Sequence, residues 1–432
     1  MLAAVIAWTG CGEGPAADAA SSTGAASAAS PAAIAASVAP SASASASAAA
    51  IASHAPGTVP TAAPKPPPRD DRLPPVPPKI ERGATAAASR KGPKGLTSAA
   101  WLDDARVAMD YAGRLDVLEV EKGATTTLVT GARVTSVAAR GATVVTLDES
   151  NRVVVWDLDE KSPPRAWTAF ASFTGTSWDA DAAIALSPKR DRVAVSSGGE
   201  VVAWDLATGK ELAQKRAEGT VWSLAVTSSE VGFAVNATSY HAWGLDADKE
   251  TGTGSFATGG TFNITVSPDL RWAAGSAPAG HGLQVSDVHG PQSLRTLVGD
   301  TDCAHHVSAM FSSDSRYLYA LLGPDRVKGF ATESWKPYAS YAAEPGRMIR
   351  SMADDLSRVV TTKEHAAPEV VHVGTRKATP LDQPFDLATE HPYAINPAGT
   401  MIVATETQES SSRRLRVWSA KTGKRIYEVT PD

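Results

Sequence analysis

The chain has 432 residues, two cysteines and a formal net charge of −5. Residues 1–96 carry eight Lys or Arg against five Asp or Glu, a net charge of +3, so the remainder has a net charge of −8. A mildly acidic domain of this kind is a poor candidate for electrostatic nucleic-acid binding, and we expect no nucleic-acid partner. About 335 residues can bury a sizeable core without disulfides.

The chain opens with an apolar stretch, Met1–Cys11, that is too short to cross a membrane as a helix. The small residue Gly10 followed by Cys11 resembles the end of a bacterial lipoprotein signal, in which cleavage before the cysteine leaves a thiol that is acylated. The resemblance implies a signal over residues 1–11, lipidation of Cys11, and a protein held at the bacterial cell envelope by its lipid, at the outer membrane or on the periplasmic side. A chance apolar start on a soluble protein is the alternative.

Residues 12–95 consist mainly of Ala, Ser, Pro, Thr and Gly, with a proline cluster over residues 64–78. Such a composition cannot bury enough apolar surface to offset the entropy lost on ordering, so we expect a disordered tether. As a flexible chain it would span on the order of 50 Å. This spacer directly behind Cys11 is what a globular domain held at a membrane needs.

From about residue 97 the chain repeats a short pattern, in which an apolar run ends in an aromatic or apolar residue followed by a small or acidic residue and a polar turn. The clearest copies are 153–157 (VVVWD), 201–205 (VVAWD), 240–244 (YHAWG) and 415–419 (LRVWS). The anchor residues of eight such units are Leu118, Trp156, Trp204, Trp243, Ser286, Phe330, His372 and Trp418. A spacing of about 43 residues is the period of a β-propeller blade.

Each unit reads as four strands separated by turns. Polar turns such as 187–190, 267–270 and 312–315 precede short alternating segments such as 192–195, which have the two-residue period of half-buried strands. We therefore predict an all-β propeller of four-stranded blades over residues 96–432. Eight blades are favoured, and seven remain possible because the first unit is weak. We expect the first and last blades to meet edge to edge without an exchanged strand.

The repeats resemble those of the WD-repeat propellers. The best matches to that family's third-strand signature are Trp156-Asp157, the segment 204–210 (WDLATGK) and the segment 418–424 (WSAKTGK). Ser286, Phe330 and His372 stand at the tryptophan position in other units, and the Gly-His pair that often opens a family repeat is missing. The resemblance implies the propeller fold.

The sequence lacks the motifs of common catalytic sites, with no G-x-S-x-G turn, P-loop or H-E-x-x-H. The nearest approach to a metal site is the segment 302–306 (DCAHH), but adjacent histidines in a strand point to opposite faces. We therefore expect no enzyme activity, no cofactor and no metal ion. The favoured function is an envelope-anchored scaffold that binds a protein or peptide through loops on one face. The alternatives are a small-molecule or glycan sensor using the central channel, and a quinoprotein-like oxidoreductase.

The four tryptophans at the anchor position are expected in the core, whereas Trp178 and Trp222 lie at the beginnings of first strands, where exposure is more plausible. Aromatic residues and arginine commonly anchor interfaces. The candidates for a ligand-binding face, each just ahead of a first strand, are Trp178, His306, Arg347 and His391. We expect the protein to be a monomer that meets the membrane only through its lipid.

Overall fold

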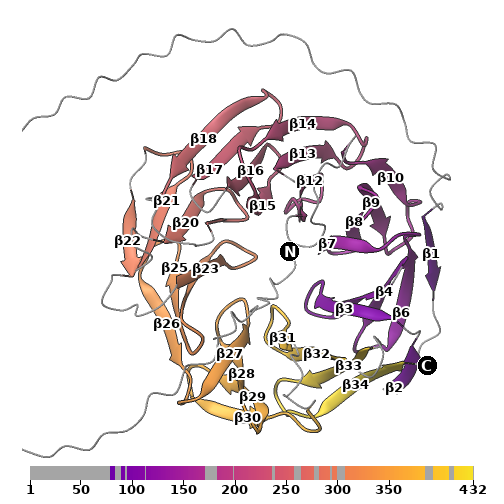
Figure 1. Ribbon diagram of the computed structural model, residues 1–432, viewed down its shortest axis with the longest axis vertical. Helices are drawn as coiled ribbons and strands as arrows, with labels where there is room; N and C mark the ends of the chain where they lie inside the picture. The colour runs from indigo at the N-terminus through magenta and orange to yellow at the C-terminus, as the bar shows by residue number, and fades with distance from the viewer. Residues whose placement is uncertain are drawn as a thin grey trace, which may run out of the picture. The chain divides into compact units, whose positions relative to one another are not determined.

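Eight β-sheets are arranged around a ring in the computed structural model, and every regular element of its described residues is a strand (Figure 1). The structure describes residues 78–82, 89–92, 95–111, 113–170, 182–197, 199–235, 239–256, 264–276, 282–291, 294–298, 307–384, 393–407 and 413–431. The prediction of an eight-bladed propeller is confirmed, and the seven-bladed alternative is wrong.

Blades 1 to 4 each contain four consecutive antiparallel strands, numbered from the centre of the ring outward. Blade 1 comprises β3 (Leu96–Trp101), β4 (Arg106–Tyr111), β5 (Arg114–Glu119) and β6 (Ala124–Val129), and blade 2 comprises β7 (Val134–Arg140), β8 (Thr143–Asp148), β9 (Arg152–Asp157) and β10 (Arg165–Thr168). Blade 3 comprises β11 (Ala183–Leu186), β12 (Arg192–Ser197), β13 (Glu200–Asp205) and β14 (Glu211–Arg216), and blade 4 comprises β15 (Val221–Val226), β16 (Glu230–Val235), β17 (Ser239–Gly244) and β18 (Lys249–Ser255).

Blades 5 to 8 follow the same order. Blade 5 comprises β19 (Thr265–Val266), β20 (Trp272–Ser276), β21 (Leu283–Asp287) and β22 (Arg295–Val298), and blade 6 comprises β23 (Val307–Phe311), β24 (Tyr317–Leu322), β25 (Arg326–Ala331) and β26 (Pro337–Ala342). Blade 7 comprises β27 (Arg347–Met352), β28 (Arg358–Lys363), β29 (Ala366–His372) and β30 (Lys377–Pro380), and blade 8 comprises β31 (Tyr393–Ile395), β32 (Met401–Thr407), β33 (Arg413–Ser419) and β34 (Arg425–Pro431).

The turn between the first and second strands has a recurring backbone form. Its fourth residue has a positive φ angle in five blades, at Arg190 (62°), Leu270 (58°), Ser315 (64°), Leu356 (53°) and Gly399 (68°). In each, that residue's backbone N–H donates to the carbonyl three residues earlier. These hydrogen bonds close the tight turns that the sequence predicted.

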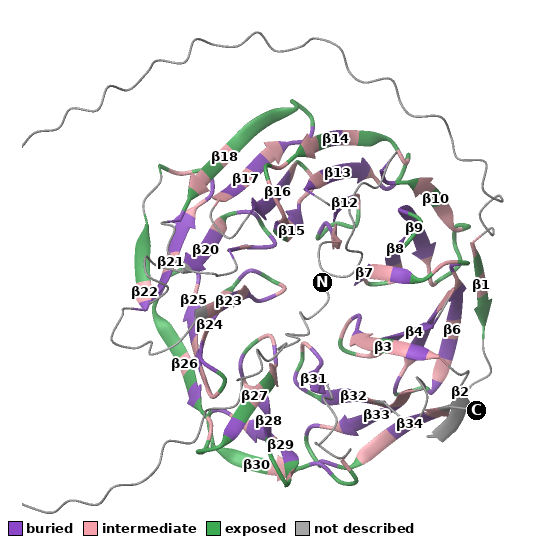
Figure 2. Cartoon of the chain, viewed as in Figure 1, coloured by how far each residue is buried: buried purple, intermediate pink, exposed green. Residues whose placement is uncertain are grey.

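One cluster of buried hydrophobic residues lies between each pair of neighbouring blades, so the core is a ring of eight interfaces. The two middle strands of each blade are mostly buried, inner strands such as β11 and β27 are mostly intermediate, and outer strands such as β18 and β26 are mostly exposed (Figure 2). The anchor tryptophans Trp156, Trp204 and Trp418 are at most 3% exposed, which confirms their prediction as core residues. Trp243 is only partly buried.

Two strands precede blade 1 and extend the outer edges of two blades. Strand β1 (Lys79–Arg82) pairs antiparallel with β6, and β2 (Ser89–Gly92) pairs parallel with β34 of blade 8 (Figure 1). Both lie inside the range 12–95 that we expected to be linker, so the structure differs from that expectation here. Each blade keeps four strands of its own, so none of them is exchanged, but β2 from ahead of blade 1 adds a fifth strand to blade 8 that the sequence did not predict.

Candidate functional site

The ring has two faces with different connections. Because the strands of each blade are antiparallel and consecutive, the turns between first and second strands and between third and fourth strands lie on one face, here called the turn face. The connections between second and third strands, and those that enter each first strand, lie on the opposite face, here called the loop face. Arg347, one of the ligand-face candidates chosen from the sequence, is the first residue of β27 and therefore lies at the loop face.

Hydrogen bonds join the turns of neighbouring blades on the turn face. The backbone N–H of Ser313 in blade 6 donates to the Asp354 carboxylate of blade 7 (3.2 Å), and the backbone N–H of Asp354 donates to the Pro397 carbonyl of blade 8 (2.9 Å). The backbone N–H of Ala398 then donates to Asp104 Oδ1 of blade 1 (2.7 Å). Four consecutive turns are thereby fixed to one another, which gives this face a rigid frame for side chains that point outward.

Blade 6 presents an exposed cluster of arginine and tyrosine on the turn face. We call Asp314, Arg316, Tyr317 and Tyr338 the arginine–tyrosine patch. The rings of Tyr317 and Tyr338 lie 4.5 Å apart between centroids, and the Arg316 guanidinium carbon lies 5.6 Å from the Tyr317 ring centroid. The side chain of Arg316 is 73% exposed, and Tyr338 is 40% exposed. The patch thus combines two residue types that dominate interface energetics.

Asp314 holds Arg316 in this position. Its carboxylate accepts hydrogen bonds from Ser312 Oγ (2.7 Å) and from the backbone N–H of Arg316 (3.0 Å), and it forms an ion pair with the Arg316 guanidinium. Burial acts to raise the pKa of Asp314, but these hydrogen bonds outweigh it and the pKa lies below the ordinary value. The carboxylate is therefore ionised at neutral pH, and the cation is oriented over the tyrosine ring.

The hydroxyl end of Tyr338 is fixed against blade 7. Tyr338 Oη donates to the Asp355 carbonyl (3.0 Å) and lies 3.3 Å from Tyr319 Oη. Burial of this end raises the pKa of Tyr338 to about 12, so the phenol stays protonated as a donor. The ring lies across Gly329, where a Cβ atom would stand 2.7 Å from Tyr338 Cε1, so a larger residue at 329 would displace the ring. Glycine in the neighbouring strand therefore makes room for this exposed aromatic residue.

A second arginine–aromatic pair occupies the equivalent place in blade 5. The guanidinium carbon of Arg271 lies 5.1 Å from the Trp272 ring centroid, and Trp272 meets Trp335 of blade 6 edge to face at 4.8 Å. Trp335 is 7% exposed, so this indole pair chiefly fills the interface between the two blades. The exposed Arg271 extends the same chemistry along the turn face, next to the arginine–tyrosine patch.

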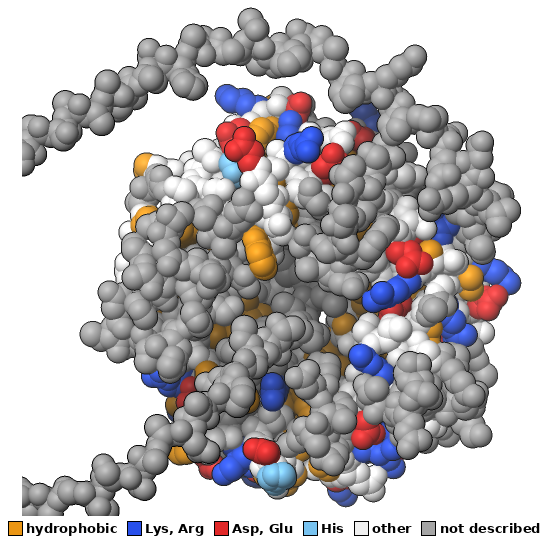
Figure 3. All heavy atoms as spheres, in the orientation of Figure 1, with side chains coloured by type: hydrophobic (Ala, Val, Ile, Leu, Met, Phe, Trp, Pro, Cys, Tyr) orange, Lys and Arg blue, Asp and Glu red, His pale blue; other side chains and the backbone are white. Residues whose placement is uncertain are grey.

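Two large hydrophobic residues are exposed on the inner strands, where Figure 3 shows hydrophobic side chains around the centre of the ring. We call Trp222 and Met348 the inner-rim pair. Each is the second residue of the first strand of its blade, and they are 54% and 39% exposed. A β-bulge between Val221 and Ser223 leaves Trp222 without a cross-strand partner, and bulges of this kind redirect a side chain. The exposure of Trp222 that the sequence suggested is confirmed.

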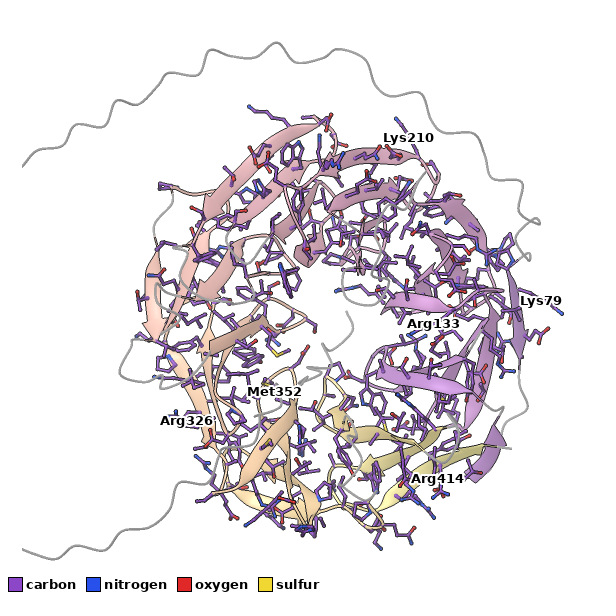
Figure 4. The ribbon with its side chains drawn as sticks, viewed as in Figure 1. Lys79, Arg133, Lys210, Arg326, Met352 and Arg414 are labelled. Carbon is purple, nitrogen blue, oxygen red and sulfur yellow. The ribbon has the colours of Figure 1, made fainter. Side chains whose placement is uncertain are left out.

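The inner strands also place flexible hydrophobic side chains near the middle of the ring. Met352, the last residue of β27, lies toward the centre, whereas Lys210 and Arg326 lie at the periphery (Figure 4). Met352 packs against the buried cluster shared by blades 6 and 7.

Of the four ligand-face candidates, the structure describes Arg347 alone. Its side chain is only 9% exposed, and its Nη2 lies 2.8 Å from Glu369 Oε1, so it forms a buried ion pair and not an exposed contact. Trp178, His306 and His391 lie outside the described residues, as does Cys11.

Within the described residues no group of three or more His, Cys, Asp or Glu side chains could hold a metal ion, and the segment 302–306 lies outside them. The part of the chain that the structure describes also has no helix that is long and apolar enough to span a membrane.

The comparisons with known proteins assign no family to this chain. No protein-family model matches the sequence, and no curated protein is similar to it. Among solved structures, a computationally designed protein called Ika8 is similar, with 14% identity, 68% of this chain and 86% of the designed chain covered, and a TM-score of 0.49. The architecture therefore rests on the strand pairing of this chain itself.

Sequence reasoning missed the arginine–tyrosine patch. The order Ser-x-Asp-x-Arg-aromatic occurs at 267–272 and again at 312–317. Its Ser and Asp predict a turn, but they do not by themselves predict an exposed patch. The recurrence of Arg followed by an aromatic residue, directly after a turn and in two consecutive units, was the signal that could have found the patch.

Proposed function

We propose that this protein is a non-enzymatic scaffold whose arginine–tyrosine patch binds a protein or peptide partner. The observation that carries the proposal is an exposed, preorganised pair of residues, Arg316 and Tyr338, on a frame of hydrogen-bonded turns. Aromatic side chains and arginine supply most of the binding energy in many interfaces, and little conformational entropy is lost when their positions are already fixed.

The proposal includes the location and the family resemblance. The tether-like composition of residues 12–77 and the lipoprotein-like segment ending at Cys11 support a propeller anchored at the bacterial cell envelope. The segments 204–210 and 418–424 support a relationship with the WD-repeat propellers. In this arrangement the tether lets the propeller reach a partner while the lipid holds it at the membrane.

A second candidate function is a small-molecule or glycan sensor that uses the centre of the ring. The exposed indole of Trp222, on a bulged inner strand, favours it because an exposed aromatic face can stack on a planar or sugar ligand. The two candidates use opposite sides of the molecule and can be separated by mutation.

The test is a crosslinking pull-down from bacterial envelope extracts with three full-length baits. These are the wild type, the patch variant Arg316→Ala/Tyr338→Ala and the inner-rim variant Trp222→Ala/Met348→Ala. A partner recovered by the wild type and the inner-rim variant but lost by the patch variant supports the scaffold. A partner retained by the patch variant refutes the assigned surface, and loss only in the inner-rim variant favours the second candidate.

A further inference from the structure

Arginines from three neighbouring blades meet at one turn of the turn face, between β7 and β8 of blade 2. Arg140 is the last residue of β7, and Gly141 follows it in the turn. From blade 1, Arg106 Nη2 donates to the Gly141 carbonyl. From blade 3, the Arg190 side chain lies against Gly141, where an added Cβ atom would stand 2.5 Å from Arg190 Nη1 and 3.3 Å from Arg190 Cζ. We call Arg106, Arg140 and Arg190 the arginine triad.

The carboxylate in contact with the arginine triad neutralises one of its three positive charges. Asp103 pairs with Arg106, whose Nε donates to Asp103 Oδ2 (2.8 Å). Among the described residues, neither the Arg140 guanidinium nor the Arg190 guanidinium donates a hydrogen bond or forms an ion pair. Three positive charges less one negative charge leave two positive charges at this turn.

The other carboxylates of the neighbouring turns have partners of their own. Asp159, in the turn between β9 and β10, pairs with Lys161 Nζ (3.0 Å). Asp157 accepts a hydrogen bond from the backbone N–H of Asp159 (3.1 Å), and Asp191 accepts one from Ser187 Oγ (2.7 Å). These contacts hold the three carboxylates away from ion pairs with Arg140 and Arg190.

The two unpaired guanidinium groups repel each other. Burial lowers the pKa of the half-buried Arg140, and the positive charge of the exposed Arg190 lowers this pKa further. Both side chains remain charged at neutral pH, because an arginine is not deprotonated in proteins. A half-buried cation without a partner raises the free energy of the folded chain, and a bound anion would relieve both the desolvation and the repulsion.

We propose that the arginine triad is a binding site for a phosphate group, carried by a small molecule or by a lipid headgroup. The two uncompensated positive charges match a phosphate monoester, which carries about −1.5 to −2 charges at neutral pH. Guanidinium groups bind phosphate oxygens through two parallel N–H donors, and the Arg140 and Arg190 donors are not used within the described residues. Arg106, which Asp103 and the Gly141 carbonyl hold in place, forms the blade 1 side of the site.

This site is separate from the arginine–tyrosine patch of blade 6, so its test does not depend on the proposed scaffold function. All chains are full-length and carry Cys11→Ser, so that no acyl chain binds to vesicles. The triad variant adds Arg140→Gln/Arg190→Gln, and a charge-conserving variant adds Arg140→Lys/Arg190→Lys. A control variant adds Lys249→Gln/Arg295→Gln, which removes two positive charges from exposed positions of β18 and β22.

Two probes separate the possible sources of the phosphate group. Inorganic phosphate is titrated at constant ionic strength, and its binding is measured from the phosphorus-31 NMR linewidth. Co-sedimentation is measured with phosphatidylcholine vesicles that contain or lack phosphatidic acid. Binding of inorganic phosphate alone indicates a small soluble ligand, and co-sedimentation that requires phosphatidic acid indicates a lipid headgroup.

We expect binding in the triad variant to be weaker by about tenfold or more, because both uncompensated cations are gone. The charge-conserving variant should show a smaller loss, since lysine keeps the charge but lacks the paired donors of arginine. The control variant should bind as the wild type does. The proposal is overturned if the chain with Cys11→Ser alone binds neither probe, if the triad variant binds as tightly as that chain, or if the control variant loses as much binding as the triad variant.

Discussion

Removal of the Trp101 side chain tests whether the boundary between blade 8 and blade 1, here called the seam, is a packed core interface. Trp101 is 2% exposed in β3, packs in the cluster shared by blades 1 and 8, and donates its indole N–H to the Ala394 carbonyl across the seam. Of the three tryptophans with the lowest exposure, it is the one at this boundary. Its truncation therefore removes both packing and a hydrogen bond from the place where the ring closes.

The size of the effect follows from the buried area. A buried tryptophan removes on the order of 150–250 Å² from water, which at about 25 cal/mol per Å² gives about 4–6 kcal/mol. Measured losses for large aromatic residues replaced by alanine are about 3–5 kcal/mol. We expect Trp101→Ala to lower the free energy of unfolding by about 4 kcal/mol. Trp101→Phe keeps most of the packing but leaves the Ala394 carbonyl without this donor, so a loss of about 1–3 kcal/mol is expected.

Urea unfolding followed by tryptophan fluorescence and circular dichroism measures these losses. The midpoint should fall while the slope of free energy against urea stays unchanged. The control is Trp222→Ala, which removes an indole that is 54% exposed and should change stability by about 0.5 kcal/mol or less. Equal stability of Trp101→Ala and Trp222→Ala would refute the closed, packed seam.

Three further outcomes are expected. Trp204→Ala should lower the free energy of unfolding by about 3–5 kcal/mol in urea titration, because the side chain is 3% exposed between blades 2 and 3, and wild-type stability would show that it is not core. The tyrosinate absorbance difference between the wild type and Tyr338→Phe should appear near pH 12, since burial raises this pKa from 10.0, and a difference near pH 10 would contradict the buried hydroxyl. Because the neutral phenol is favoured in the folded state, its contribution to stability is full below pH 10.0 and is lost as the pH rises toward about 12. Cys11→Ser should release the protein from membranes in cell fractionation, and unchanged membrane association would contradict lipidation at Cys11.

The fold could be predicted because the requirements of a blade recur along the chain. Each unit needs a buried residue in its third strand and a tight turn before its second strand, and Trp156, Trp204 and Trp418 supply the first requirement. Even the weak first unit was placed correctly, because the segment 114–120 has the same apolar pattern as 152–158.

Ring closure could not be predicted from the same pattern. The strands β1 and β2 have four residues each and lie in a segment rich in Pro, Ala and charged residues, which resembles a linker in composition. They are strands because the outer edges of blades 1 and 8 pair with them, and this is a long-range effect that local sequence does not contain.

The candidate site was harder to predict because the exposure of a side chain depends on residues in the neighbouring strand or blade. Arg347 is the first residue of β27, at the loop face, yet its charge is buried against Glu369. Tyr338 looks like an ordinary strand residue in sequence, but the missing side chain at Gly329 and the hydroxyl contact with Asp355 bring its ring to the surface. Both outcomes depend on neighbours in the next strand or blade.

The first residue of the second strand differs between blades, which shows what the fold requires at that position. The second strand begins with Arg192 in blade 3, Arg358 in blade 7 and Met401 in blade 8, so the fold does not require an aromatic residue there. Blades 5 and 6 have Trp272 and Tyr317 at this position, each preceded by an arginine. Trp272 packs against Trp335 between blades 5 and 6. Tyr317 contacts the exposed Arg316 guanidinium and the ring of Tyr338. Tyr317 also packs against the cluster between blades 6 and 7, so the exposed Arg316 and Tyr338 are the residues that the proposed recognition would use.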